Sequence, residues 1–296
     1  MYYDVETDRY KCTSPPQDEV TLRPLSFCFE VTNSCHFDCD FCLISGHLPP
    51  PTTSHSREII DGLTSAGPVR IGFSGGEPLL VPAIYELGMQ AKAAGAITLL
   101  RTTGTWPIDI KRVQQAFDWV DMSVDAVDEA MYTRMRGRPG LTVLLRQTEA
   151  LLAAGIRVRF NCLLSSVNQS HLLPVMDLAK GVGVRYVRYS PFIARGKAAS
   201  SGIRQKHGLA AGELDNVYAL IRSYAAAVGI AVSVVTTVKN RAIFIVKPNG
   251  DVFFPLDAGL MTLGNVVGRD LVSMFPVELL RRHCGAYWAH NCSTSP

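Results

Sequence analysis

The feature that most constrains the fold is a regular alternation of short apolar runs with longer segments of helical period. Six runs rich in β-branched residues predict strands over 26–32, 69–74, 97–102, 120–124, 158–163 and 184–189. Between them, apolar residues recur every three or four positions and predict helices over 56–64, 83–94, 110–117, 141–154 and 169–181. Because strands alternate with helices, we expect an α/β fold with a parallel sheet and right-handed crossovers.

The pattern changes after residue 189. The segment 190–208 contains Pro191 and several glycine and serine residues and predicts a long loop, which is followed by a helix over 214–227. Two further runs, 231–238 and 242–246, predict strands, and Asn249-Gly250 predicts a hairpin with a type I′ turn. We therefore expect a β/α body over residues 1–208 and a small α+β extension over residues 209–296.

Composition excludes several classes of protein. Hydrophobic residues make up 47% of the chain and charged residues 19%, which is too apolar for a disordered protein. The net charge of +3 is not gathered into a basic run, so nothing favours a nucleic-acid partner. No apolar stretch reaches the roughly 20 residues that span a membrane, and the polar, acidic start is unlike a signal peptide. We expect a cytoplasmic globular protein without a membrane partner.

Three of the eight cysteines form a CxxxCxxC motif directly after the first predicted strand: Cys35, Cys39 and Cys42. In an intracellular chain such a cluster favours metal binding over disulfides. Each of three thiolates can bind one iron of a cubic [4Fe–4S] cluster, which leaves the fourth iron open to another ligand. The alternative is a zinc site completed by a residue such as His36. Structural zinc sites usually pair two short ligand steps, and no second step lies at a suitable distance.

A second motif, Gly75-Gly76-Glu77-Pro78, follows the second predicted strand. Its glycines permit a close backbone approach to a ligand, and the Glu77 carboxylate suits an ammonium group. By itself the segment predicts only a turn. The cysteine motif, however, follows the first predicted strand and this motif follows the second, and that order makes the pair a far more specific signal than either motif alone.

Together these motifs resemble the radical S-adenosylmethionine (SAM) superfamily, whose CxxxCxΦC pattern has an aromatic at Φ, here Phe41. The resemblance covers about residues 26–195 and implies a partial (β/α)6 barrel of the TIM type. It implies one [4Fe–4S] cluster on the three cysteines, with SAM chelating the free iron. It also implies reductive cleavage of SAM to a 5′-deoxyadenosyl radical that abstracts hydrogen from a substrate. The implied electron donor is a flavodoxin- or ferredoxin-type protein.

The resemblance also implies which residues contact SAM. Thr103 stands where the family's T-N-G element has asparagine, and Ser123-x-Asp125 resembles its ribose-binding element. In the following arginine-bearing loop, Arg134 or Arg136 is expected to pair with a carboxylate. A P-x-x-x-R-G loop ending at Arg195-Gly196 is assigned to the substrate side. The expected SAM-binding residues are Phe41, Ser74, Gly75, Gly76, Glu77, Pro78, Thr102, Thr103, Ser123, Asp125, Arg134, Asn161 and Tyr189.

The end of the chain resembles the SPASM and twitch extensions of radical SAM enzymes over 248–255 and 263–266. Leu256 occupies a position where those extensions carry a cysteine, so we expect a truncated, twitch-like extension without a second cluster. The remaining thiols are then buried apolar residues or hydrogen donors to a substrate radical. The candidate donors are Cys162, Cys284 and Cys292. Since side chains alternate along a strand, Cys162 has about an even chance of facing the barrel interior.

Three functions compete. The favoured one is an enzyme acting on a small molecule, such as a sugar, aminoglycoside or nucleoside-type natural product, by epimerisation or dehydrogenation. The alternative is a maturase that cross-links or epimerises a ribosomal peptide, although only 34 residues precede Cys35, too few for the peptide-recognition domain common in such enzymes. A non-catalytic iron–sulfur or zinc protein would leave the GGEP and S-x-D elements without a purpose.

Overall fold

The computed structural model describes residues 2–4, 9–11, 26–44, 48–235, 243–256, 259–269 and 271–276. A short hairpin pairs β1 (Tyr2–Asp4) with β2 (Arg9–Lys11). Ten further strands form a single sheet: β3 (Ser26–Glu30), β4 (Arg70–Ser74), β5 (Ile97–Thr102), β6 (Trp119–Ser123), β7 (Arg157–Leu164), β8 (Tyr186–Pro191), β9 (Ala231–Val234), β10 (Phe244–Val246), β11 (Asp251–Leu256) and β12 (Gly259–Asn265).

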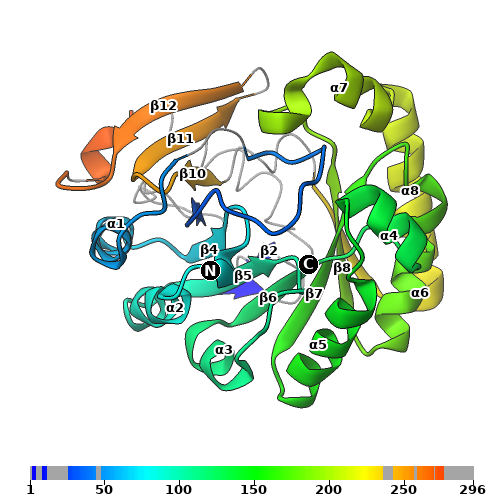
Figure 1. Cartoon of the computed structure of the whole chain (residues 1–296), viewed down its shortest axis with the longest axis horizontal. Helices are drawn as coiled ribbons and strands as arrows, with labels where there is room; N and C mark the ends of the chain where they lie inside the picture. Colours follow the sequence, from blue (N-terminus) through cyan, green and yellow to red (C-terminus); the bar gives the residue numbers. More distant parts are fainter. Residues whose placement is uncertain are drawn as a thin grey trace.

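The strands β3 to β8 pair side by side in chain order, and every pair is parallel. The helices cover the outer side of the curved sheet (Figure 1). This arrangement confirms the predicted α/β fold with a partial barrel. The helices are α1 (Thr53–Ser65), α2 (Ile84–Ala93), α3 (Ile110–Ala116), α4 (Glu129–Arg136), α5 (Leu141–Ala153), α6 (Pro174–Gly181), α7 (Ser201–His207) and α8 (Ala211–Val228), with short 3-10 turns η1 (Pro78–Leu80), η2 (Gln169–His171), η3 (Gly196–Ala199) and η4 (Val272–Met274).

Alternation along each strand separates a dry outer face from a polar interior. On β3 and β4, the Phe29 and Phe73 rings lie 6.3 Å apart, and Phe73 meets Phe117 beyond α3 at 5.5 Å. These rings are fully buried between sheet and helices. The alternate positions, such as Ser74 and Arg101, point to the other face, the barrel interior. Burial of the outer face therefore fixes which residues of each strand line the interior.

Two predicted loops contain helices. The arginine-bearing segment forms α4, whose ends carry recognisable caps: the Asp128 side chain accepts a hydrogen bond from the Met131 N–H, and Gly137 adopts a φ of 81°. The segment 190–208, predicted as a loop, contains η3 and the seven-residue α7. Its glycine and serine residues do not predict the helix, which contacts with distant residues stabilise.

The C-terminal part extends both edges of the barrel sheet. β9, which follows α8, pairs parallel with β8, while β10 pairs parallel with β3 and continues into the antiparallel strands β11 and β12. The predicted hairpin is present, but its turn is not type I′. The Gly250 N–H donates to the Lys247 carbonyl at 2.9 Å, which puts Pro248 and Asn249 at the central positions. Proline fixes φ near −65°, and only a type I or II turn accepts that value there.

The sheet thus runs continuously from residues before position 208 to residues after it. The division into domains at that position stays a prediction.

Candidate active site

The three motif cysteines lie on one loop that leaves the C-terminal end of β3. The Cys42 N–H donates to the Cys39 carbonyl at 3.3 Å, so the loop folds back on itself. Two sulfurs accept backbone hydrogen bonds at 3.4 Å, Cys35 Sγ from Phe37 and Cys42 Sγ from Ile44. Such N–H groups stabilise thiolate ligands and tune the potential of an iron–sulfur cluster. The donor set therefore fits a cluster held by three thiolates.

Without a metal, the thiols of Cys35 and Cys39 hold their protons firmly. Cys35 keeps an accessible face, yet burial raises the pKa of its thiol to about 11, and the charges of Glu77 and the other two cysteines act in the same direction. Burial also raises the pKa of Cys39, although Arg136 opposes it. Iron supplies the positive charge that ionises such thiols, so cluster binding is coupled to proton release.

The geometry argues against the zinc alternative. Within the described ranges, no three His, Cys, Asp or Glu side chains form a group that could hold a metal ion. His36, the proposed fourth ligand, points elsewhere: its Nε2 lies 2.7 Å from Thr105 Oγ1 and its ring lies 5.4 Å from that of Trp106. Ligands to the separate irons of a cubic cluster stand farther apart than ligands to one ion, so the lack of such a group among the described residues does not count against a cluster.

The GGEP glycines bring two backbones together. The Gly76 N–H donates to the Thr32 carbonyl at 2.7 Å, and the Glu77 N–H donates to the Ser34 carbonyl at 2.8 Å. A Cβ at Gly75, which has a φ of 125°, would lie 2.3 Å from the Thr32 oxygen, and one at Gly76 would lie 2.1 Å from the Ser34 oxygen. The close approach expected toward a ligand is thus made to the chain that enters the cysteine loop.

The Glu77 carboxylate is fully buried and accepts four hydrogen bonds. Oε1 accepts from Thr102 Oγ1 at 2.7 Å and the Leu79 N–H at 3.2 Å, while Oε2 accepts from Thr103 Oγ1 at 2.7 Å and its N–H at 2.8 Å. A carboxylate offers about four lone-pair positions, so these donors saturate it. Glu77 ties the GGEP loop, whose Pro78 starts η1, to the end of β5.

A chain of hydroxyl groups continues from this carboxylate to the cysteine loop. Thr103 Oγ1 lies 3.0 Å from Thr105 Oγ1, which in turn contacts His36. The threonine that replaces the family's asparagine therefore serves as a link between the loops after β3, β4 and β5.

Beyond β6, Asp125 is fully buried. Its Oδ1 accepts from the Leu163 N–H at 2.7 Å, and its Oδ2 lies 2.5 Å from Arg136 Nη2. Of the two arginines expected to pair with a carboxylate, Arg136 does so, whereas Arg134 lies exposed on α4. The carboxylate of Asp125 thus fixes the end of β7 and the end of α4. Ser123, two residues earlier, keeps an accessible side chain.

Phe41 lies between two basic side chains. The Arg136 guanidinium carbon is 5.4 Å from its ring centroid, and the His207 ring meets it edge-on at 5.4 Å. His207 is nearly fully buried, with Nδ1 2.8 Å from Ser165 Oγ and Nε2 2.9 Å from Asp40 Oδ1. The loop segment between Cys39 and Cys42 is therefore anchored on α7.

Sequence reasoning missed this anchor. Lys206 also binds Asp40, at 2.6 Å, and Lys197 binds Asp38, so basic residues after β8 neutralise both aspartates of the cysteine motif. The signal was available in the sequence as acidic residues at 38 and 40 facing a basic segment 197–207. The ion pairs between these two segments could not be predicted, because a segment predicted to be a loop has no defined position relative to the cysteine motif.

The barrel interior is accessible near the carboxyl ends of its strands. The side chains of Ser74, Ser123, Asn161 and Ser190 are half-buried, while their strand neighbours on the outer face are fully buried. Asn161 Oδ1 accepts from Ser190 Oγ at 3.1 Å. These predicted positions form a polar rim along four strands, and Glu77, Thr102 and Thr103 lie beside it.

Cys162 and Tyr189 face the other way. They lie in register on β7 and β8, and both side chains are fully buried. The Tyr189 hydroxyl donates to the Leu172 carbonyl at 2.6 Å, ahead of α6, and Asn168 Nδ2 lies 3.8 Å from Cys162 Sγ. Both residues thus belong to the layer between sheet and helices. Cys284 and Cys292 lie outside the described residues.

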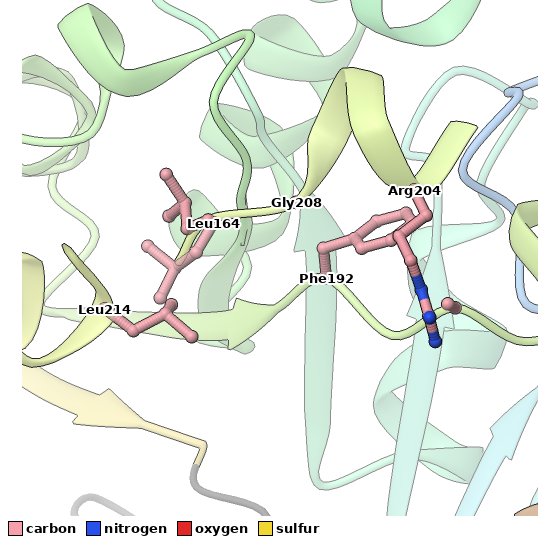
Figure 2. Close-up of a pocket in the computed structure, with 7 residues that line it drawn as sticks. Leu164, Phe192, Arg204, Gly208 and Leu214 are labelled. Atoms are coloured by element: carbon pink, nitrogen blue, oxygen red, sulfur yellow. The ribbon is translucent and has the colours of Figure 1, made fainter. Parts of the chain in front are cut away.

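A separate cavity opens beyond the carboxyl ends of β7 and β8, between α7 and α8 (Figure 2). Its volume is about 260 Å³, and it is lined mainly by apolar side chains with Arg204 at one side: Leu164, Phe192, Ala194, Arg204, Gly208, Leu209 and Leu214. Arg195, assigned to the substrate side, precedes η3 and is half-buried next to this cavity wall.

Comparisons with known proteins agree with this geometry. The family model of the radical SAM superfamily matches residues 29–179. The AdoMet-dependent heme synthase of Methanosarcina barkeri is 27% identical over 172 residues, covering 55% of this chain and 49% of the relative. The GTP 3′,8-cyclase of Chlorobaculum tepidum is 29% identical over 176 residues, covering 55% of this chain and 52% of the relative. The chain thus spans about half the length of these curated relatives.

Solved structures share the fold. Streptococcus suis SuiB, bound to its precursor peptide SuiA, superposes with a TM-score of 0.71 over 85% of this chain and 64% of SuiB, at 12% identity. At that identity the likeness concerns the fold. None of the helices in the described part of the chain has the length and apolarity to cross a membrane.

Proposed function

Because the chain belongs to the radical SAM superfamily, we propose that it cleaves SAM reductively and abstracts hydrogen from a small-molecule substrate, with epimerisation or dehydrogenation as the outcome. When bound, a reduced [4Fe–4S] cluster would pass one electron to the sulfonium group of SAM, and cleavage of its C–S bond would yield methionine and a 5′-deoxyadenosyl radical. In this chain Cys35, Cys39 and Cys42 would hold the cluster, and the rim beside Glu77 would hold SAM.

One observation carries the proposal: the cysteine loop is fastened to the loops that follow the next two strands. The Gly76 and Glu77 N–H groups bind the chain before Cys35, and the buried Glu77 carboxylate binds Thr102 and Thr103. A simple metal-binding loop would not need this arrangement. Radical chemistry does need it, because SAM on the cluster and the substrate must be held at a fixed distance from each other.

The residues of this chain would orient and enclose the cluster, SAM and the substrate. Arg136 and Asp125 pair beneath Phe41, which lies between the second and third motif cysteines, and hold that ring against the site. The polar rim, including Ser123 and Asn161, offers hydroxyl and amide groups to a ribose and a base. The fully buried layer behind the rim closes the sheet side of the site to water, which limits the side reactions of a radical.

A small-molecule substrate suits the half-buried polar interior, since concave sites with a few convergent polar groups are typical of such ligands. The curated relatives carry names of enzymes that act on small molecules, heme synthase and GTP cyclase. A flavodoxin- or ferredoxin-type protein would deliver the electron, and the accessible face of Cys35 places one cluster ligand near the surface.

The test is the release of 5′-deoxyadenosine and methionine by the anaerobically reconstituted, dithionite-reduced protein, quantified by mass spectrometry. We expect release from the wild type and none from Cys39→Ser. A wild-type protein that carries the cluster but releases no 5′-deoxyadenosine would contradict the proposal. With a substrate in hand, solvent deuterium in the product indicates epimerisation, and its absence indicates dehydrogenation.

A further inference from the structure

One layer below the polar rim, three strands contribute charged side chains to the barrel interior. Arg101, Asp121 and Arg159 stand in register on β5, β6 and β7. Asp121 and Arg159 form a two-point pair, with Nε–Oδ1 at 2.8 Å and Nη2–Oδ2 at 2.7 Å, and both are almost inaccessible. This pair neutralises itself, so it offers no free charge to a ligand.

Arg101 differs from its neighbours. A quarter of its side chain (25%) is accessible, and its Nε lies 3.4 Å from Asp121 Oδ2, longer than a good hydrogen bond. Its Nη1 contacts the Cys28 sulfur at 3.2 Å, a weak acceptor. A guanidinium has five N–H donors in a planar fork, and among the described residues only Asp121 and Cys28 accept from Arg101, so most of its donors are unused by that part of the chain.

On the neighbouring strand β4, a glycine leaves one side of this guanidinium uncovered. Gly72 on β4 does not adopt a positive φ, so its backbone does not require glycine. A Cβ there would lie 3.8 Å from Arg101 Cζ and 3.9 Å from Nη2, in ordinary contact with the guanidinium. The missing side chain therefore keeps open the space beside the fork, rather than satisfying a turn.

The other charges that face the interior from the described strands have partners. Glu30 on β3 binds Lys247, and Arg70 and Arg188 are buried and engaged, Arg70 with the Ser26 hydroxyl at 3.0 Å among its contacts. Among the described interior residues, Arg101 thus combines a full positive charge, accessibility and unused donors.

We propose that Arg101 binds an oxyanion of the substrate, a carboxylate or a phosphate, in the interior below SAM. The proposal rests on the proposed function, because it places the substrate in the same barrel. Arg101 directly precedes Thr102 and Thr103, which hold Glu77, so an anion bound here is tied to the strand end that orients the site. A planar fork accepts two oxygens of one anion and thereby fixes the direction of the substrate.

The experiment titrates the anaerobically reconstituted, SAM-loaded enzyme with inorganic phosphate and, separately, with acetate, by isothermal titration calorimetry. We expect saturable binding of at least one anion, weakened about tenfold or more by Arg101→Gln, as for the loss of a charge-assisted pair. The matched control is Arg138→Gln, an exposed arginine, which should leave binding unchanged. The two titrants distinguish a phosphate site from a carboxylate site.

The affinity for SAM is measured in parallel, because the methionine carboxylate carries the same chemistry. Unchanged SAM affinity in Arg101→Gln supports a substrate site, whereas a matching loss of SAM affinity overturns it. No saturable anion binding, or equal binding in both variants, also overturns it. If Arg101→Gln does not fold, Arg101→Lys keeps the charge without the fork and should still weaken anion binding; equal affinity would then refute the proposal.

Failure of the proposed function is a different result. It would show as wild-type protein that does not release 5′-deoxyadenosine, whatever the anion titrations give.

Discussion

Replacing Glu77 with glutamine tests whether this side chain serves the protein scaffold or contacts a ligand ammonium directly. Glutamine preserves the shape of the side chain but turns one oxygen acceptor into an NH₂ donor. Each carboxylate oxygen now accepts from one threonine hydroxyl and one backbone N–H. A hydroxyl can reverse its role, but a backbone N–H cannot. Either amide orientation therefore leaves the N–H of Leu79 or of Thr103 facing another donor.

The cost follows from burial. A buried donor left without an acceptor costs about 1–3 kcal/mol, and the loss of charge-assisted bonds adds to it, so we expect a loss of about 2–4 kcal/mol in the free energy of unfolding. With a urea m-value of about 3 kcal/mol/M, the unfolding midpoint should fall by about 1 M.

The assay is urea unfolding followed by far-UV circular dichroism, with Glu149→Gln on the exposed side of α5 as the matched control. The control should unfold at the wild-type midpoint. If Glu77→Gln also unfolds within about 0.2 M of the wild type but binds SAM more weakly, the carboxylate acts as an ammonium ligand, and our account of a saturated structural link is refuted.

Three further predictions concern the loops and the interior. Gly76→Ala forces a Cβ to within 2.1 Å of the Ser34 carbonyl oxygen, so iron bound per chain after reconstitution should fall by more than half, measured by inductively coupled plasma mass spectrometry; full iron content would contradict this. His207→Phe keeps the ring packing but removes the bond to Asp40, so the cluster should bleach faster in air without a change in circular dichroism, and an unchanged bleaching rate would speak against the anchor. Burial raises the pKa of Asp121, but the neighbouring guanidinium groups outweigh burial and hold the pKa below its ordinary value. This carboxylate therefore stabilises the fold above about pH 4, and its contribution falls as the pH drops further. The urea midpoint of Asp121→Asn should be lower than that of the wild type and should depend less on pH between about 5 and 3, and an equal dependence of the midpoint on pH in both proteins would exclude this contribution.

The barrel could be predicted because its signals are local. Each strand carries a short apolar run, and Gly95 and Gly155 mark helix ends with φ values of 89° and 74°, as their positions indicate. The hairpin turn was mispredicted because the restraint on φ at Pro248 outweighs the preference of Asn249-Gly250 for positive φ. α7 was missed because contacts with distant residues, such as the bond from His207 to Asp40, stabilise it rather than its own sequence.

The motifs of the site could be predicted, but not the partners of each side chain. Sequence spacing located Glu77 and Asp125, yet it could not show that local donors saturate one carboxylate or that Arg136, rather than Arg134, pairs with the other. Those outcomes depend on which face of α4 is buried. The sequence also could not show which face of β7 carries the Cys162 side chain. That face is known only from the folded sheet, where alternate residues of the strand are buried against the helices.

The measurement that tests the central claim most directly is Mössbauer spectroscopy of the ⁵⁷Fe-reconstituted protein before and after addition of SAM. Three thiolate ligands predict about four iron atoms per chain, with about one quarter of the iron signal shifting when SAM occupies the iron without a cysteine ligand. A spectrum that SAM leaves unchanged, or a protein that takes up zinc in place of iron, would contradict the claim. Iron content near eight per chain would instead show a second cluster in the C-terminal extension.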